Sequence, residues 1–217
     1  MKCCETGRSM IEMLGVLAII GVLSVGGMMG YSKMMNQHKI NSSLEQIGII
    51  SAKISAYGSG ADSYDGLDIS SAIKLGAVPS SAVDGSALIN PYGGNTYIRS
   101  SWIDSTASST DKQAYIIVYT NLDEEACVAL GSSAWGNVRN STFIGLGVGK
   151  VRTNSVDGDI KTLEKLLYMG CPGVTDSSSY AVACSGGSVL APPMDAGTAA
   201  LACECPDTDC AFIMKFF

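Results

Sequence analysis

Residues 7–29 read GRSMIEMLGVLAIIGVLSVGGMM, and Glu12 is the only charged residue between Met10 and Met29. An α-helix rises about 1.5 Å per residue, so about twenty residues cover the roughly 30 Å hydrocarbon core of a bilayer. An apolar run of this length is typical of a membrane-spanning helix. A carboxylate near the end of such a helix is unfavourable unless it reaches the interface or meets a partner. Glu12 is therefore a candidate functional residue.

The residues on either side of this apolar run indicate that it stays in the mature protein and predict its orientation in the membrane. No convincing small-x-small cleavage site follows it, which disfavours a removed signal peptide. Lys2 and Arg8 precede it. The positive-inside rule therefore predicts a cytoplasmic N-terminus with the bulk of the chain on the other side of the membrane.

The helical pattern continues beyond the apolar run. Apolar residues recur every three or four positions, which predicts one face of an amphipathic helix; they are Ile40, Leu44, Ile47, Ile50, Ile54 and Tyr57. Polar residues fall largely on the other faces, among them Lys39, Asn41, Ser42, Glu45, Gln46 and Lys53. We expect a single helix from about Ser9 to Tyr57. Two helices broken near Gly26, Gly27 and Gly30 are the alternative, because each glycine destabilises a helix interior by about 0.5–1 kcal/mol.

The remainder of the chain predicts short strands and helices. Strands are expected at Asn95–Ile103, Ala114–Thr120, Thr142–Val148, Tyr180–Cys184 and Cys210–Phe217. Helices are expected at Asp68–Leu75, Asn121–Gly131, Asp159–Met169 and Ala196–Cys203, with Asn121 and Glu124 forming a capping box. The predicted fold is α+β: the long N-terminal helix, membrane-spanning in its first half, packs on an antiparallel sheet of four or five strands.

Composition and motifs argue against several classes of function. The net charge is −6, and the acidic excess follows Tyr57, which disfavours nucleic acid or an anionic membrane surface as a partner. His38 is the only histidine, so a Ser-His-Asp site has no base. Gly145–Lys150 lacks the spacing of a phosphate-binding loop. We expect no enzyme activity and no cofactor.

Six of the eight cysteines lie in the segment that we expect to be exported, where disulfides persist: Cys127, Cys171, Cys184, Cys203, Cys205 and Cys210. Six cysteines allow fifteen pairings, and the residues alone do not choose among them. Cys203, Cys205 and Cys210 could instead hold a metal, but an oxidising compartment favours disulfides.

A short polar leader that ends at Gly7, followed by an apolar helix with Glu12 five residues later, resembles the N-terminus of type IV prepilins. The resemblance implies a leader at 1–7, a long helix at 8–57 (assembly half 8–30, amphipathic half 31–57) and a globular head at 58–217. In that family a membrane peptidase cuts after the glycine, here between Gly7 and Arg8, and methylates the new amine, here that of Arg8. The glutamate, here Glu12, neutralises the amine of a neighbouring subunit. Arg8 departs from the family's usual apolar residue, and four residues from Glu12 it could also pair with it within one chain.

Parts of the head resemble type IVb pilins, namely Asn90-Pro91-Tyr92-Gly93-Gly94, Ala126–Leu130 before Trp135-Gly136, and the C-terminal strand after a cysteine-bearing helix. This resemblance implies a bond between Cys127 and Cys203. Cys171–Cys184 and Cys205–Cys210 then remain as short-range pairs.

The resemblance implies a structural subunit of a type IV (IVb-like) pilus that serves adhesion, aggregation or conjugation. Its partners would be copies of itself, the prepilin peptidase, the pilus assembly platform with its ATPase, and membrane lipid before assembly. The chain would cross the inner membrane once and then enter an extracellular pilus. A type II secretion pseudopilin and a signal-anchored exported binding domain are the alternatives.

Overall fold

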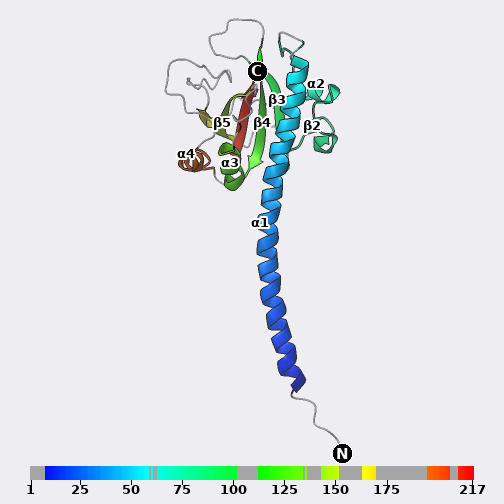
Figure 1. Cartoon of the computed structure of the whole chain (residues 1–217), viewed down its shortest axis with the longest axis vertical. Coiled ribbons are helices and arrows are strands. Elements are labelled where there is room, and N and C mark those ends of the chain that lie inside the picture. The colour runs from blue at the N-terminus through cyan, green and yellow to red at the C-terminus, as the bar shows by residue number, and fades with distance from the viewer. Residues whose placement is uncertain are drawn as a thin grey trace, which may run out of the picture. The chain divides into compact units, whose positions relative to one another are not determined.

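The computed structural model describes residues 8–58, 60, 63–101, 112–133, 135, 143–151, 163–169, 195–205 and 210–217. The chain divides into two compact units, with the boundary between Lys39 and Ile40. One uninterrupted helix, α1 (Arg8–Gly58), supplies the first unit and begins the second (Figure 1). The prediction of a single long helix is confirmed, and the structure has no break at the Gly26–Gly30 glycines.

A five-stranded antiparallel sheet dominates the described part of the second unit (Figure 1). Its strands are β3 (Thr96–Ser101), β4 (Ala114–Leu122), β7 (Cys210–Phe216), β5 (Phe143–Val151) and β6 (Leu163–Met169), in that spatial order. The C-terminal strand β7 thus lies in the middle, pairing with β4 through Ile117 and Met214 and with β5 through Leu146 and Met214. The predicted antiparallel sheet is confirmed.

Short elements complete this unit. They are α2 (Ile69–Lys74), the 3-10 turn η1 (Ser80–Ala82), the hairpin of β1 (Val83–Asp84) and β2 (Ala87–Leu88), α3 (Glu124–Gly131) and α4 (Ala196–Ala202). Asp68 caps α2 as part of a capping box with Ser71. Asp123 and Asp195 cap α3 and α4 by accepting hydrogen bonds from the N–H groups of Ala126 and Thr198.

The core lies between the C-terminal half of α1 and the sheet. Ile47, Ile50 and Ile54 are fully buried in one cluster with side chains of β4 and β7, among them Tyr115, Ile117, Tyr119, Phe212 and Met214. Ile40 is buried and Leu44 packs against the cluster, so the predicted apolar face is confirmed at these positions.

The predicted face was wrong at its last residue and on its polar side. Tyr57 is 53% exposed, and its hydroxyl donates to the Leu75 carbonyl oxygen at 2.9 Å. Gln46 is buried: its Oε1 accepts from the Tyr119 hydroxyl, and its Nε2 donates to the Ile89 carbonyl oxygen at 3.3 Å. A glutamine can occupy the core because both ends of its amide are paired there.

Two further predictions need correction. The helix expected at Asp159–Met169 is wrong where it is described, because Leu163–Met169 forms β6 and pairs with Leu146–Val151 of β5. Asn121 does not cap α3, because β4 continues to Leu122 and Asn121 itself has a φ of 60°. The strand predicted at Tyr180–Cys184 lies outside the described residues.

Candidate assembly surface

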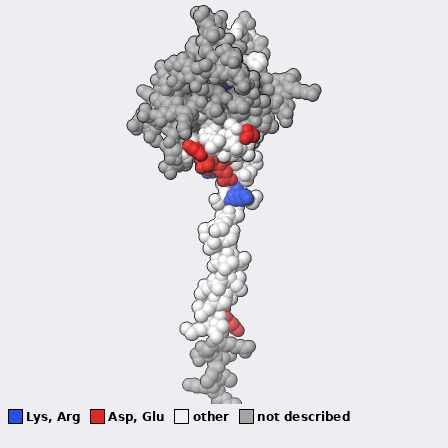
Figure 2. All heavy atoms as spheres, turned by 90° about the vertical axis from the view of Figure 1, so that its left-hand side faces the viewer, with Lys and Arg blue, Asp and Glu red and all other residues white. Residues whose placement is uncertain are grey.

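The first unit presents an apolar surface on all sides of a helix. Large apolar side chains from Met10 to Met34 are exposed, for example Ile11 at 75% and Met34 at 76%. Figure 2 shows this part of α1 as almost entirely uncharged. The segment is long and apolar enough to cross a membrane. It far exceeds the apolar patch that a soluble monomer exposes, so lipid or other protein must cover it.

Glu12 lies about one turn from the start of α1 at Arg8. It belongs to the described part of α1, whereas Gly7 lies outside the described residues. Arg8 is the first residue of α1. Lys33 is the next charged residue along the chain after Glu12, so the carboxylate of Glu12 stands out within an otherwise uncharged stretch.

Glycines on this stretch are not required by packing within the described chain. A Cβ added at Gly15, Gly21, Gly26, Gly27 or Gly30 would meet no atom within 4 Å. Small residues on membrane helices allow other helices to approach closely. The glycines are therefore suited to contacts with another helix.

Among the residues that the structure describes, two disulfides hold the C-terminal part of the second unit. Cys127 of α3 is bonded to Cys203, which follows α4, and the two are 76 positions apart. Cys205 is bonded to Cys210, the first residue of β7. Cys127, Cys203 and Cys210 are fully buried. The first is the pair that the family resemblance implied, and the second is one of the two short-range pairs that then remained, while Cys171 and Cys184 lie outside the described residues.

Aromatic packing joins the same region to the sheet. The Trp135 indole N–H donates to the Leu130 carbonyl oxygen of α3 at 2.7 Å. Its ring lies 6.0 Å from that of Phe212 on β7 and 6.3 Å from that of Phe143 on β5, between ring centroids. The disulfide-bonded helices α3 and α4 are thus fixed to the central strands.

The Asn90–Gly94 turn ties the start of the sheet to the end of β4. The buried Asn90 side chain accepts from the N–H groups of Tyr92 (2.9 Å) and Gly94 (3.1 Å) and donates to the Thr120 carbonyl oxygen (2.8 Å). Gly93 has a φ of 82°, and a Cβ at Gly94 would overlap the Thr120 carbonyl oxygen. Both glycines are therefore needed for this turn. Burial, with the charges of Asp123 and Glu125 as smaller causes, raises the pKa of Tyr92, which keeps this phenol neutral.

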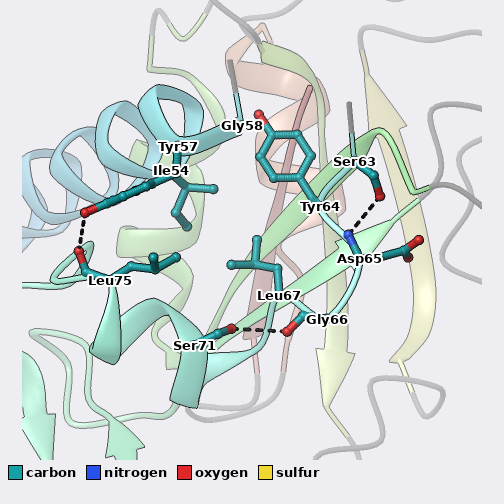
Figure 3. Close-up of a pocket in the computed structure, with 10 residues that line it drawn as sticks. All are labelled: Ile54, Tyr57, Gly58, Ser63, Tyr64, Asp65, Gly66, Leu67, Ser71 and Leu75. Atoms are coloured by element: carbon teal, nitrogen blue, oxygen red, sulfur yellow. Dashed lines mark hydrogen bonds between the residues drawn. The ribbon is translucent and has the colours of Figure 1, made fainter. Parts of the chain in front are cut away.

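A cavity of about 170 Å³ lies between the end of α1 and α2 (Figure 3). Tyr57, Tyr64, Leu67 and Leu75 give it a mainly apolar lining. A Cβ at Gly58 would overlap the Tyr64 ring, so that ring packs closely against the end of α1. The residues that line the cavity include no histidine, cysteine or lysine. Because its lining is mainly apolar, we assign the cavity a packing role.

Sequence reasoning missed the β1–β2 hairpin and the buried Gln46–Tyr119 hydrogen bond. The hairpin had a signal, because Asp84-Gly85 is a common turn sequence between strands and Gly85 has a φ of 60°. The glutamine had none, because a polar residue beside an apolar face is normally at the surface.

Comparisons with known proteins agree with this architecture. A family model described as PilS N terminal matches residues 37–187. The major structural subunits of the bundle-forming pilus from Escherichia coli O127:H6 (strain E2348/69 / EPEC) and from E. coli O111:H- are each 28% identical over 139 residues, covering 61% of this chain and 69% of theirs. The crystal structure of TcpA, a type IV pilin from Vibrio cholerae El Tor biotype, matches 84% of this chain and 99% of its own with a TM-score of 0.50 at 16% identity. The chain therefore belongs to the PilS N-terminal family and is a type IV pilin.

Proposed function

We propose that this chain is the structural subunit of a type IVb-like pilus and polymerises through the N-terminal half of α1. One observation carries the proposal: an exposed, apolar helical surface with a single carboxylate, Glu12, precedes a folded, disulfide-bonded head. Membership of the PilS N-terminal family supports it, as does the similarity to the major structural subunits of the bundle-forming pilus. We infer that the chain acts through assembly and not as an enzyme.

Processing would create the second charge that assembly needs. We propose that the prepilin peptidase removes residues 1–7 by cutting between Gly7 and Arg8 and methylates the new amine of Arg8. That amine and Glu12 are then separated by four residues, or about 6 Å along the helix. The mature chain would comprise the long helix, 8–57, and the head, 58–217.

Charge pairing between copies would set the stagger of the helices. A helix that leaves lipid for a bundle of similar helices exchanges one apolar environment for another, so apolar contact alone selects no unique arrangement. A carboxylate without a partner in that environment is strongly unfavourable. We infer that the favoured stagger places Glu12 of one copy next to the N-terminal amine of a neighbour.

The chain would meet its other partners in sequence. Before assembly it would cross the inner membrane once, in contact with lipid, with its N-terminus in the cytoplasm. The assembly platform and its ATPase would then extract it into the growing fibre. The mature pilus would lie outside the cell.

The test replaces Glu12 by alanine, with Glu45→Ala as the matched control. Glu45 lies on the same helix, but its side chain is exposed on the second unit. We expect Glu12→Ala to abolish fibres in electron micrographs of sheared cells while leaving the amount of membrane-bound chain unchanged. Glu45→Ala should leave fibres intact. Normal fibre numbers with Glu12→Ala would refute the assembly role.

Mass spectrometry of the mature chain tests the processing step separately. We expect an N-terminal peptide that begins at a methylated Arg8. A peptide that still contains residues 1–7 in purified fibres would contradict the cleavage site.

A further inference from the structure

The native disulfides do not all join cysteines that are consecutive along the chain. Cys127 is bonded to Cys203, although Cys171 and Cys184 lie between them in the sequence. We propose that correct pairing of this pilin requires a thiol–disulfide isomerase of the compartment into which the head is exported. The inference rests on the proposed function, because it needs the head to enter an oxidising compartment N-terminal end first.

Chain order favours the wrong partner for Cys127. A chain that emerges from its N-terminal end presents Cys171 and Cys184 to the oxidant before Cys203. Even in a fully emerged chain, the loop from Cys127 to Cys171 is shorter than the 76 positions to Cys203. Loop-closure entropy then favours the nearer partner by about twofold. Early oxidation therefore gives consecutive pairs.

Folding cannot correct the early mispairing of Cys127, because the native contacts of Cys127 depend on β7. Cys127 lies on α3, which packs against α4 and β7. β7 is the central strand of the sheet and comprises Cys210–Phe216, so it follows Cys127, Cys171, Cys184 and Cys203 in the sequence. The structure that brings Cys127 and Cys203 together therefore cannot form until β7 has emerged.

Thiol–disulfide exchange converts the consecutive pairs into native pairs without net oxidation. The isomerase thiolate attacks the Cys127–Cys171 bond, forms a mixed disulfide with Cys127 and releases the Cys171 thiolate. That thiolate attacks Cys184 of a Cys184–Cys203 bond, forms Cys171–Cys184 and releases the Cys203 thiolate. Cys203 then attacks Cys127 of the mixed disulfide, forms the native bond and returns the isomerase thiolate. The number of disulfides is the same before and after.

Burial makes the exchange one-way. In the folded chain Cys127 and Cys203 are fully buried, so an attacking thiolate cannot reach their sulfur atoms. A mispaired chain cannot bury the same atoms, because it cannot form the α3–α4 contact with Cys127 bonded elsewhere. The isomerase therefore acts on mispaired chains and releases native ones.

The experiment expresses the full chain in a Gram-negative host whose periplasmic thiol oxidase is intact, with and without the periplasmic disulfide isomerase. Free thiols are blocked with N-ethylmaleimide, and disulfide-linked peptides are quantified by mass spectrometry. We expect the Cys127–Cys203 peptide to fall severalfold without the isomerase and peptides that link Cys127 to Cys171 or Cys184 to appear. Fully random pairing would leave the Cys127–Cys203 bond in about one in five oxidised chains, and purely consecutive pairing would leave it in none.

Two double variants test the cause. In Cys171→Ser with Cys184→Ser, the four remaining cysteines pair natively in consecutive order, so we expect the isomerase to make no difference. Cys205→Ser with Cys210→Ser keeps the intervening cysteines, so the dependence should persist. Should the first variant fold poorly, mispaired wild-type chain from the isomerase-free host provides a second measurement. Added isomerase in a glutathione buffer should convert it to the native pairing.

Equal yields of the Cys127–Cys203 peptide with and without isomerase would overturn the proposal and leave the proposed function untouched. A failure of added isomerase to rescue the mispaired chain would also overturn it. The proposal would also be overturned if the yield of the Cys127–Cys203 peptide still depended on the isomerase to the same extent in the variant that lacks Cys171 and Cys184. Fully reduced cysteines in both hosts would instead contradict the exported head, and with it both the proposed function and this inference.

Discussion

Replacing Cys127 and Cys203 together by alanine should destabilise the second unit more than replacing Cys205 and Cys210. In the chain-entropy description, the entropy that a disulfide removes from the unfolded chain grows with the logarithm of loop length. For a separation of 76 positions this gives a stabilisation of about 4.5 kcal/mol at 25 °C. For a separation of 5 positions it gives about 2 kcal/mol. The difference between the two double variants should therefore be about 2–3 kcal/mol.

Guanidinium unfolding of the full chain in detergent micelles measures both losses. Trp135 packs against Phe143 and Phe212, so its fluorescence reports on the sheet and α3 together. A Trp102→Phe background leaves it as the only tryptophan, since the sequence has two. With a denaturant slope of about 4 kcal/mol/M, the long-range variant should lose about 1 M in its midpoint, twice the loss of the short-range one. Equal losses, or a larger loss in the Cys205–Cys210 variant, would refute the loop-length reasoning.

Three further perturbations follow from the packing. Ile50→Ala should lower the free energy of unfolding by about 2–5 kcal/mol, because Ile50 is fully buried. Ile49 is only half-buried, so Ile49→Ala should lower the free energy of unfolding by less. Chemical denaturation of the two variants compares these losses. Gly94→Ala should destabilise the unit in the same assay, because the new methyl group overlaps the Thr120 carbonyl oxygen; a neutral result would mean that the turn can open. The backbone N–H of Ser71, then its hydroxyl, lowers the pKa of Asp68. Asp68 therefore stabilises α2 above the ordinary carboxyl pKa, and this contribution is lost as the pH falls through the lowered pKa. Asp68→Asn should flatten the acid side of the stability–pH curve, and an unchanged curve would contradict the cap.

Sequence reasoning worked best where one periodicity acted over a long stretch. The helix from Arg8 to Gly58 followed from an apolar run and then from apolar residues spaced three or four apart, because both patterns describe one element. β4 was equally clear, since Ala114–Thr120 is β-branched and aromatic and is buried throughout except at its last residue. In these segments the helix or strand that the local sequence favours is the one that the fold contains.

It failed where pairing partners decide the structure. Leu163–Met169 is rich in leucine and reads as a helix, yet its backbone pairs with β5 as β6, so tertiary context overrides local propensity. Asn121 is a common helix-capping residue, but it lies within β4, which continues to Leu122. Among the candidate site residues, the pairing of Cys127 with Cys203 came from the family resemblance, because the sequence alone does not distinguish among the fifteen possible pairings of six cysteines.

The central position of β7 has a practical consequence for anyone who edits this gene. A stop codon at Cys210 removes β7, the middle strand of the sheet, and exposes the facing edges of β4 and β5, which invites aggregation. A nonsense mutation at this position should therefore behave as a null allele. For peptide display on the fibre, the exposed Gly85-Ser86 turn between β1 and β2 is a safer graft point than the C-terminus.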